Sequence, residues 1–457
     1  MRRKNDFDYT IIGSGPAGTT AAMSLAKAKK RVAIIEEHFF GGSNLNTRDV
    51  PYFTAAKAAN VYRKALSMPE FNNQDISISL PNLLSHQLQS IIRADGNNKK
   101  LYEEAGIICL HGPANILDKN TVAVGDQKFS TSSIILATGS KLKTSEISGV
   151  ESVNFLTPET AIKIRRLPKV AIIIGAGSSG CEIAEFYASL GTKAILLEMA
   201  DRILPNEDPE VGETMTNFFT HELGMIVLPN CKVVALEQHQ TTKRIIFQTG
   251  NSEKYVQTDC VILATGSQPY LDYGLENAGI KYKNTGILVD KLFQTSTKNI
   301  YAIGDCLGGE SSTARAEYQG MLLAYNLLNK SKNTASYHGF IRSTKTCPEI
   351  ATVGFTEDDL IKRDRKYKKT IVHLNETTIG KVNDDKYSFV KMICDKKTDR
   401  ILGCTIVAPN AELIAEEMSF AIRYHLTAIE VASTPHPTNN YNYMLKIAAK
   451  NLVGKKK

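Results

Sequence analysis

The feature that most constrains this fold is a strand–glycine turn–helix–strand segment that occurs twice. From Asp8 the chain reads DYTIIGSGPAGTTAAMSLAKAKKRVAIIEE, which is an apolar strand, a glycine turn, an alanine-rich helix and a second apolar strand ending in acid. The stretch VAIIIGAGSSGCEIAEFYASLGTKAILLEM has the same order further along the chain. Each segment predicts a βαβ unit, so we expect two parallel sheets covered by helices.

The first unit has the pattern G-x-G-x-x-G at Gly13, Gly15 and Gly18. These glycines permit a tight turn, close approach of the backbone to a pyrophosphate, and close helix–strand packing. The helix N-terminus then presents unpaired N–H groups to the phosphates. Glu36 closes the second strand, where a carboxylate can accept hydrogen bonds from a ribose diol. The segment therefore predicts a dinucleotide site.

The second unit repeats the pattern at Gly175, Gly177, Gly180 and Glu198. A second nucleotide site is therefore expected. The spacing between the units is too long for a solenoid repeat and indicates duplicated domains.

Three other strands support this organisation. Two apolar strands close on the same tetrapeptide, Ala-Thr-Gly-Ser, and end at Ser140 and Ser267. A third, NIYAIGDCLGG, ends in Gly304-Asp305. An acid at the carboxyl end of a strand can bind hydroxyls of a ligand. The alternative is that Asp305 caps the helix that follows, and the sequence leaves both possibilities open.

The remaining segments predict helices and then a terminal domain. Residues 54–105 predict two polar-faced helices around the loop Met68–Leu80. From Gly339 the composition shifts to alternating strands such as YSFVKMICD and ILGCTIVA, followed by the helix AELIAEEMSFAIRYHL and the loop ASTPHPTNNYN. This pattern predicts an α+β domain.

Composition excludes several classes of protein. Hydrophobic residues make up 42% and charged residues 22%, which are ordinary globular values. No apolar run reaches the roughly 18 residues that span a bilayer, and the first one breaks at Gly13, so we expect no signal peptide and no membrane insertion. The net charge of +8 is dispersed, with dense basic runs only at Arg2–Lys4 and Lys455–Lys457, so no nucleic-acid partner is expected. We expect a cytoplasmic enzyme.

The eight cysteines have no spacing typical of a zinc site or a local redox pair, so no metal site is predicted. Most lie among apolar neighbours and are expected to be buried, reduced thiols. Cys394 and Cys404 flank a predicted hairpin turn and could face each other across two strands, but a functional disulfide is not expected in the cytoplasm.

A series of motifs occurs in a characteristic order: GSGPAG with Glu36, GGSNLN, the two ATGS strands, GAGSSG with Glu198, YAIGD, CPEIATVGFTE and HPT at 436–438. Taken together they resemble the pyridine nucleotide-disulfide oxidoreductase family, in particular its dihydrolipoamide dehydrogenase-like members. The resemblance implies an α/β fold with two Rossmann-like dinucleotide-binding domains, for FAD and NAD, plus a C-terminal α+β dimerisation domain. The expected boundaries are 1–145 and 268–335 for the FAD-binding and central parts, 146–267 for the NAD-binding domain, and 336–457 for dimerisation.

The resemblance also implies the residues that bind each cofactor. Those expected at FAD are Gly13, Gly15, Gly18, Glu36, Gly42, Ala137, Thr138, Gly139, Asp305 and Ala314. Those expected at NAD are Gly175, Gly177, Gly180, Glu198 and Gly266. NADH is expected over NADPH, because the Glu198 carboxylate would repel a 2′-phosphate and no adjacent arginine pair replaces it, although Arg202 is nearby.

The sequence departs from the family where the chemistry takes place. The family passes electrons from NADH through the flavin to a disulfide between cysteines five positions apart, and these positions hold Asn44 and Asp49. The lysine that follows corresponds to Phe53, whereas its glutamate partner is retained as Glu182. That ion pair is lost, so Glu182 is expected to have a raised pKa or another donor. Neither Asn44 nor Asp49 can form a disulfide.

Two further positions differ. The aromatic gate over the nicotinamide side corresponds to Ser178, which leaves that side less covered. The family's interface dyad keeps its histidine as His436, but Tyr441 stands in place of the glutamate and supplies no negative charge. His436 is therefore either catalytic or part of an inherited loop. Asp49 is either a proton donor near the flavin or the cap of a helix.

These observations favour an FAD-dependent NADH oxidoreductase, a homodimer, that passes electrons from the flavin directly to an unidentified non-disulfide acceptor such as a quinone, a small oxidant or oxygen. Candidate catalytic residues are His436, Asp49 and Glu182. One alternative is a disulfide reductase that uses a displaced cysteine such as Cys347. The other is a non-catalytic flavin-bound scaffold.

Overall fold

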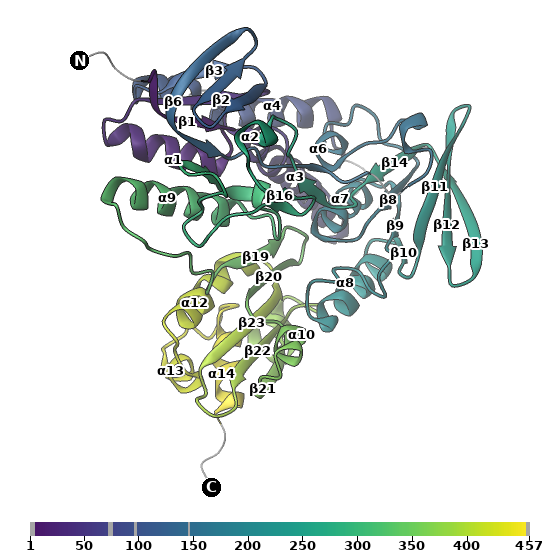
Figure 1. Ribbon diagram of the computed structural model, residues 1–457. Coiled ribbons are helices and arrows are strands. Elements are labelled where there is room, and N and C mark those ends of the chain that lie inside the picture. The colour runs from purple at the N-terminus through teal and green to yellow at the C-terminus, as the bar shows by residue number, and fades with distance from the viewer. Residues whose placement is uncertain (1–4, 72–75, 96–97, 145–146, 454–457) are drawn as a thin grey trace.

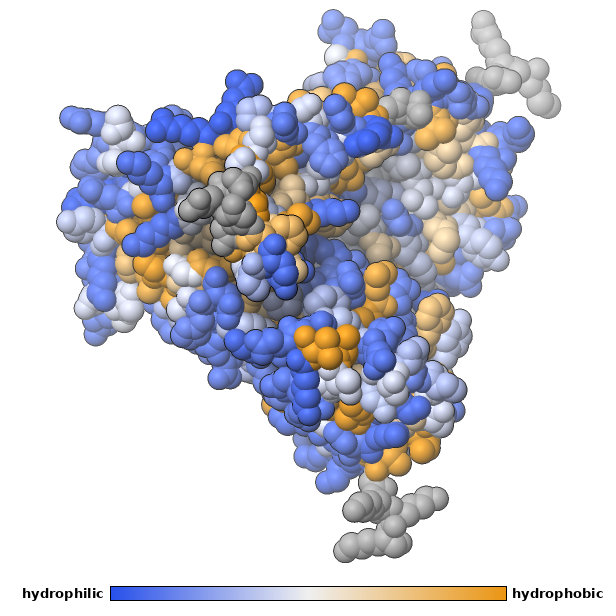
Figure 2. Space-filling model, turned by 180° about the vertical axis from the view of Figure 1, so that it is seen from behind, coloured by the Kyte–Doolittle hydropathy of each residue, from blue (hydrophilic) through white to orange (hydrophobic). Residues whose placement is uncertain are grey.

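The computed structural model describes residues 5–71, 76–95, 98–144 and 147–453 (Figure 1). The basic runs at both ends and part of the loop predicted between Met68 and Leu80 lie outside these ranges. Two sheet-containing regions lie side by side, and the C-terminal residues form a separate lobe below them. The same lobe projects from the rest in Figure 2, where hydrophilic side chains dominate the visible surface and apolar side chains lie in patches between them.

The first sheet has the parallel order that the first βαβ unit predicts. Strand β1 pairs with β2 and with β6, β2 pairs with β3, and β18 pairs with β6, all in parallel. An antiparallel meander, β4 and β5, joins the first half of β6. The bounds are β1 Phe7–Ile12, β2 Val32–Glu36, β3 Ile108–His111, β4 Ala114–Asp118, β5 Thr121–Val124, β6 Gln127–Leu136 and β18 Ile300–Ala302. The YAIGD strand therefore returns to this sheet from a distant part of the chain.

Helices α1 (Pro16–Lys27) and α9 (Thr313–Asn329) pack against each other beside this sheet. Their backbones approach closely at Gly320, where a Cβ would lie 2.4 Å from the carbonyl oxygen of Ala17. This contact fixes the start of α9 next to the first glycine turn.

The second sheet is also parallel, with the order β10-β9-β8-β14. Its strands are β8 Val170–Ile174, β9 Lys193–Leu197, β10 Ile226–Leu228 and β14 Cys260–Leu263, with helices α7 Ser178–Ser189 and α8 Pro209–His221. An antiparallel sheet projects from it at one side of Figure 1 and consists of β11 Lys232–His239, β12 Thr242–Thr249 and β13 Ser252–Thr258. Two short strands, β7 Ser140–Leu142 and β15 Ser267–Pro269, pair where the two ATGS segments end. The repeat seen in the sequence is thus a repeat in the fold.

The segment after the first unit is more helical than the sequence predicted. Its helices are α2 Gly42–Asn46, α3 Asp49–Ser67, α4 Leu80–Asp95 and α5 Asn98–Glu104. The prediction of two helices in 54–105 was therefore wrong in number. Helix α3 also begins earlier than predicted, at Asp49, and packs against α7 of the second region.

The C-terminal lobe is a five-stranded antiparallel sheet with the order β19-β20-β23-β22-β21. Its strands are β19 Ile341–Thr344, β20 Glu349–Gly354, β21 Tyr367–His373, β22 Phe389–Asp395 and β23 Ile401–Ala408; its helices are α10 Glu357–Lys362, α11 Thr378–Val382, α12 Ala411–Arg423, α13 Ala428–Ser433 and α14 Tyr443–Leu452. Alternating burial was expected for β22 and β23, yet nearly every residue of both strands is buried. The reason is that helices α12 and α14 cover one face while Phe389 and Val407 on the other pack into the core around α8.

The register of β22 and β23 places Cys394 opposite Ile401 and Cys404 opposite Met392. The two cysteines thus do not face each other, and all eight cysteines are free thiols. The remaining elements are α6 Pro158–Ala161, β16 Tyr282–Lys283, β17 Gly286–Ile287 and the 3₁₀ turns Val150–Ser152, Leu275–Ala278, Gly304–Leu307 and Leu374–Glu376.

Candidate active site

A cavity of about 1370 Å³ lies where the two parallel-sheet regions and the C-terminal lobe meet. The predicted site residues that line it are Gly13, Gly15, Glu36, Gly42, Asp49, Ala137, Thr138, Gly139, Glu182, Asp305 and Ala314. The predicted residues that do not line it are Gly18, Gly175, Gly177, Gly180, Glu198, Gly266 and His436. The structure thus brings most of the predicted FAD positions together around one cavity.

The first glycine turn leaves room for a phosphate. Gly13 has a φ of +99°, and a Cβ at Gly18 would lie 2.0 Å from the carbonyl oxygen of Gly13, so both positions exclude a side chain. A Cβ at Gly15, by contrast, would meet no atom within 4 Å. A side chain at Gly15 would project into open space before the N-terminus of α1, where an anion binds most favourably. The turn therefore fits the pyrophosphate of a dinucleotide.

Glu36 closes this turn. Its carboxylate accepts hydrogen bonds from the amide of Ser14 at 3.0 Å, the hydroxyl of Ser14 at 2.6 Å and the amide of His38 at 2.9 Å. Since Glu36 also lines the cavity, a carboxylate oxygen with remaining lone pairs lies at the end of β2, where a ribose would be bound.

The second glycine turn has the same geometry. Gly175 has a φ of +99°, a Cβ at Gly180 would lie 1.9 Å from the Gly175 carbonyl oxygen, and one at Gly177 would meet nothing within 4 Å. Glu198 accepts hydrogen bonds from the amides of Ala176 at 2.7 Å and Ala200 at 2.8 Å, and is 7% exposed. This turn also fits a dinucleotide.

Asp305 joins two of the predicted motifs. It accepts a hydrogen bond of 3.4 Å from the hydroxyl of Ser140 in the first ATGS segment. The turn that contains Asp305 has no side-chain cap, and the cap of α9 is Ser312. Of the two alternatives for Asp305, helix capping is therefore excluded, and its position on the cavity wall favours a ligand role.

Asn44 and Asp49 contact each other directly. The Asn44 amide donates a short hydrogen bond to the Asp49 carboxylate and a second, of 2.6 Å, to the hydroxyl of Thr313 at the start of α9. Thr313 in turn donates to Asp49 over 3.3 Å. Asp49 makes no capping hydrogen bond at the start of α3, so the capping alternative was wrong. Burial raises the pKa of Asp49 and outweighs the lowering effect of the Thr313 hydrogen bond.

Glu182 has both features expected of a glutamate that has lost its cation. Burial raises its pKa to about 7, and its carboxylate accepts a hydrogen bond of 2.7 Å from the backbone amide of Lys345. The donor comes from the segment between β19 and β20, far from α7 in the sequence. Nearby, the hydroxyl of Thr344 donates to that of Ser178 over 2.8 Å. The 344–345 segment therefore lies along the side of the cavity that α7 forms.

The side chain of Lys345 places a cation in this region. Its ammonium lies 5.8 Å from the centre of the Phe53 ring and makes short ion pairs with Glu349 and Glu412. Burial alone would lower the pKa of Lys345, but the hydrogen bonds to Glu349 and Glu412 outweigh it and raise the pKa. A charged ammonium thus lies beside the position where the resemblance placed a lysine, although it pairs with other acids than Glu182.

Behind the cavity wall lies a second buried acid, Glu185. It accepts hydrogen bonds from the amide of Cys347 at 2.9 and 3.1 Å and pairs with Arg63 at 3.4 Å, and burial raises its pKa to about 8. Burial also raises the pKa of the Cys347 thiol. No cysteine is among the residues that line the cavity in the described ranges. A raised pKa and a position outside the cavity both disfavour Cys347 as a nucleophile.

His436 has a carboxylate partner that the sequence did not reveal. Its Nε2 lies 2.9 Å from the carboxylate of Glu417 on α12, and its Nδ1 lies 2.8 Å from the carbonyl oxygen of Thr434. The carboxylate that contacts His436 thus comes from Glu417 and not from the position of Tyr441. Tyr441, at the expected glutamate position, instead accepts a hydrogen bond of 2.9 Å from Asn383. Both ring nitrogens of His436 face oxygen atoms of its own subunit.

The sequence did not reveal three side chains that contact the predicted residues or border the cavity: Thr313, Lys345 and Glu417. Each reaches its partner from a distant segment, so no local spacing could have predicted it. Lys345 and Thr313 line or border the cavity because α9 and the β19–β20 turn converge on α3.

Comparison with known families decides the classification. The family model described as "Pyridine nucleotide-disulphide oxidoreductase" matches residues 7–320, and the corresponding "dimerisation domain" matches residues 342–446. The chain belongs to the pyridine nucleotide-disulphide oxidoreductase family. Members of this family are FAD-dependent oxidoreductases that use pyridine nucleotides, in agreement with the two glycine turns described above.

The chain is similar over nearly its whole length to characterised members. It is 28% identical over 455 residues to the mercuric reductase of Staphylococcus aureus, covering 98% of this chain and 83% of the relative. It is also 28% identical over 446 residues to the dihydrolipoyl dehydrogenase of Mycoplasma pneumoniae, covering 95% and 96%.

Solved structures share the fold. The Cu(II) complex of the HOCl-induced flavoprotein disulfide reductase RclA from Escherichia coli and LpdA from Mycobacterium tuberculosis both superpose with a TM-score of 0.88 at 22% identity, covering 98% of this chain and 100% of theirs. In the described ranges no helix is long and apolar enough to cross a membrane.

Proposed function

We propose that this protein is an NADH oxidoreductase that passes electrons through bound FAD directly to a non-disulfide acceptor. The observation that supports this most strongly is the Asn44–Asp49 hydrogen bond, since these two residues stand where the family's redox cysteines would be. A bound flavin would take electrons from the nicotinamide and release them to an acceptor. A dithiol relay at positions 44 and 49 is excluded by their chemistry.

The chain's own residues supply what such a reaction needs besides the flavin. Reduction of a quinone by NADH consumes one proton in addition to the hydride equivalent. Asp49 is half-buried at the cavity wall and burial raises its pKa, so it is the candidate donor of that proton. The exposed ring of Phe53 and the Lys345 ammonium beside it suit a planar acceptor with a carbonyl oxygen.

The preference for NADH is supported by the surroundings of Arg202. This arginine is the nearest cation to Glu198 in the sequence, but its guanidinium pairs with Asp358 at 3.2 Å and with Asp201 at 3.5 Å. An arginine held by two carboxylates is less available to a 2′-phosphate, and the Glu198 carboxylate would repel one.

The assembly we propose is a homodimer in the cytoplasm. Apolar side chains are exposed on α12 and just after it, with Leu413 70%, Phe420 56% and Tyr424 65% exposed, and on α13, with Ile429 54% exposed, all within the matched dimerisation domain. The eight free thiols agree with a reducing compartment.

The decisive experiment is anaerobic mixing of the flavin-loaded protein with NADH, followed by a panel of acceptors. We expect NADH to bleach the visible flavin band, quinones to restore it with turnover, and lipoamide and glutathione disulfide to leave it bleached. The Cys347→Ser variant is the matched control and should behave as the wild type. Turnover of a disulfide that disappears in Cys347→Ser would support the displaced-cysteine alternative, and failure of NADH to bleach the flavin would support a scaffold.

A further inference from the structure

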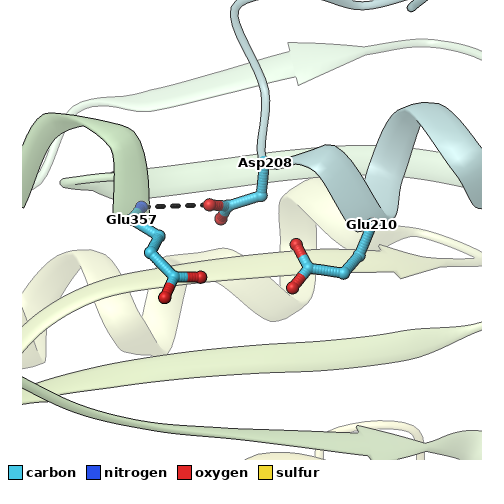
Figure 3. A group of neighbouring side chains, drawn as sticks. All are labelled: Asp208, Glu210 and Glu357. Carbon is cyan, nitrogen blue, oxygen red and sulfur yellow. Dashed lines mark hydrogen bonds between the residues drawn. The ribbon is translucent and has the colours of Figure 1, made fainter. Parts of the chain in front are cut away.

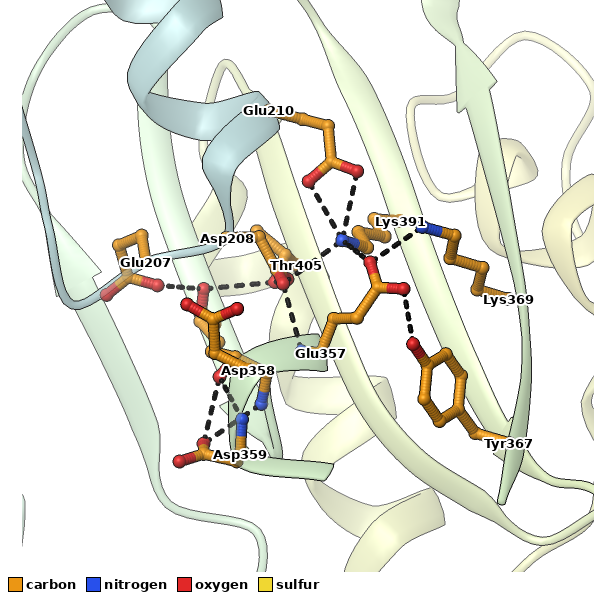
Figure 4. Close-up of polar contacts among 12 residues, drawn as sticks. Glu207, Asp208, Glu210, Glu357, Asp358, Asp359, Tyr367, Lys369, Lys391 and Thr405 are labelled. Atoms are coloured by element: carbon orange, nitrogen blue, oxygen red, sulfur yellow. Dashed lines mark hydrogen bonds and ion pairs between the residues drawn. The ribbon is translucent and has the colours of Figure 1, made fainter. Parts of the chain in front are cut away.

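Outside the cavity, the most unusual group of side chains surrounds a fully buried lysine. Asp208, Glu210 and Glu357 converge with carboxylate oxygens within 4.8 Å of one another, an arrangement that resembles a metal site (Figure 3). The ammonium of Lys391 occupies the space between them, at 3.1 Å from Asp208, 2.8 Å from Glu210 and 2.8 Å from Glu357 (Figure 4). The lysine therefore serves as the cation of this cluster.

The cluster joins two parts of the fold. Asp208 and Glu210 lie at the start of α8 in the second parallel-sheet region, whereas Lys391 on β22 and Glu357 at the start of α10 belong to the C-terminal lobe. Lys391 is 0% exposed and Asp208 1%. Removal of the ammonium would leave the buried Asp208 carboxylate without its counter-charge, which is strongly unfavourable.

A chain of polar contacts leads from this cluster to the cavity wall (Figure 4). The hydroxyl of Thr405 donates to Asp208 over 3.0 Å, the hydroxyl of Thr352 lies 3.3 Å from that of Thr405, and Thr352 donates to Glu207 over 2.6 Å. Glu207 lines the cavity and also accepts from Arg342 over 3.4 Å. The buried cluster and the cavity are therefore connected through residues 207 and 208.

The same segment contacts the second glycine turn directly. The amide of Leu204 donates to the carbonyl oxygen of Ala176, within the turn itself, over 2.8 Å. Leu204 has a φ of +51°, a conformation that a leucine adopts only when its surroundings hold it. Pro205 and Asn206 line the cavity beside it. The segment 204–208 thus links the turn at one end to Lys391 at the other.

We infer that Lys391 is a positioning residue for the nicotinamide-nucleotide site: its ammonium anchors Asp208 and thereby fixes segment 204–208 against the second glycine turn. This inference rests on the proposed function, because it assigns the nucleotide to that turn. Lys391 itself lies outside the cavity lining and touches no reacting atom.

The test measures binding of NAD⁺ to the oxidised, flavin-loaded protein, which requires no acceptor and no turnover. Lys391→Met should raise the dissociation constant at least about tenfold, since it removes the anchor of the segment, while flavin content stays unchanged. Lys391→Arg, which keeps the charge, should recover part of the affinity. Lys369→Met is the matched control. Lys369 also pairs with Glu357, at 2.7 Å, but it is 44% exposed and among the described residues it makes no ion pair with Asp208, so NAD⁺ binding should change less than about twofold.

Because Lys391→Met can destabilise the whole protein, a milder variant provides an independent test. Thr405→Val removes the hydroxyl that connects Asp208 to Thr352 and leaves every charge in place. It should weaken NAD⁺ binding about threefold or more, and peptides covering 203–208 should exchange amide hydrogen faster, with unchanged exchange in the first glycine turn. Wild-type NAD⁺ affinity and wild-type exchange of 203–208 in folded Lys391→Met and Lys391→Arg, with the same result in Thr405→Val, would overturn the inference. A wild-type protein that binds no NAD⁺ would instead contradict the proposed function, while the exchange of 203–208 would still decide the role of Lys391.

Discussion

The side-chain amide of Asn44 on α2 donates a hydrogen bond to the carboxylate of Asp49 at the start of α3. The same amide reaches Thr313 on α9. This polar triad joins three helices at the cavity wall and contains an acid whose pKa burial raises. Asn44, Asp49 and Thr313 thus form a connected group of hydrogen-bonded side chains at the cavity wall.

If Asp49 donates the proton to the acceptor, Asp49→Asn should lower the rate of quinone reduction about 100-fold, within the usual range for a general acid. The wild-type rate should fall as the pH rises through the raised pKa of Asp49, because only the protonated acid donates. Thr313→Val removes a hydrogen bond that lowers this pKa, so it should move the decline to higher pH. Equal pH profiles for the wild type and Asp49→Asn would contradict a proton-donor role.

The raised pKa of Glu182 should make the stability of the folded protein depend on pH. Its pKa is raised from an ordinary 4.5 to about 7, so the folded protein binds an extra proton between these values and loses stability as the pH rises through that window. Glu182→Gln removes this loss and keeps an acceptor for the Lys345 amide. The unfolding free energy of Glu182→Gln minus that of wild type should therefore be higher at pH 8 than at pH 5, by on the order of 2 kcal/mol. Denaturant titrations at the two pH values, with the exposed Glu253→Gln as control, measure the difference.

The Lys345→Met variant tests whether the Lys345 ammonium stabilises the folded protein. Glu349 and Glu412 would lose their shared ammonium, which should cost about 2 kcal/mol of unfolding free energy. The exposed Lys57→Met on the neighbouring α3 is the matched control and should stay within about 0.5 kcal/mol of wild type. Since Lys345 lowers the pKa of Asp49, its removal should also shift the pH profile of quinone reduction upward. An unchanged stability would show that the ion pairs are not formed in solution.

The cofactor preference can be tested at Asp358. Asp358→Ala removes one carboxylate partner of Arg202, so the guanidinium can contact a 2′-phosphate. The ratio of kcat/KM for NADPH to kcat/KM for NADH should rise about tenfold, because a hydrogen bond to a charged group contributes about that factor. Steady-state kinetics with both nucleotides give the ratio. Asp364→Ala, an exposed acid in the turn that follows α10, serves as control. If Asp358→Ala leaves the ratio as in the wild type, Arg202 does not take part in discrimination.

How far the sequence could predict this molecule depends on how local each feature is. Gly13, Gly175 and the strands around them follow from spacing, because a glycine turn between a strand and a helix is a local structure. The partner of His436 was missed because Glu417 lies on another element and shares no motif with it. The position of Lys345 beside α3 was missed for the same reason. The burial of β22 on both faces depends on docking against α8, which no pattern within the strand reveals.

In the proposed reaction, electrons leave the flavin without a thiol relay. It is tested most directly by anaerobic titration of the flavin-loaded protein with NADH, with titration of thiols before and after. We expect one equivalent of NADH per flavin to complete the reduction and no new thiol to become titratable. Uptake of a second equivalent, accompanied by two new thiols per subunit, would contradict it.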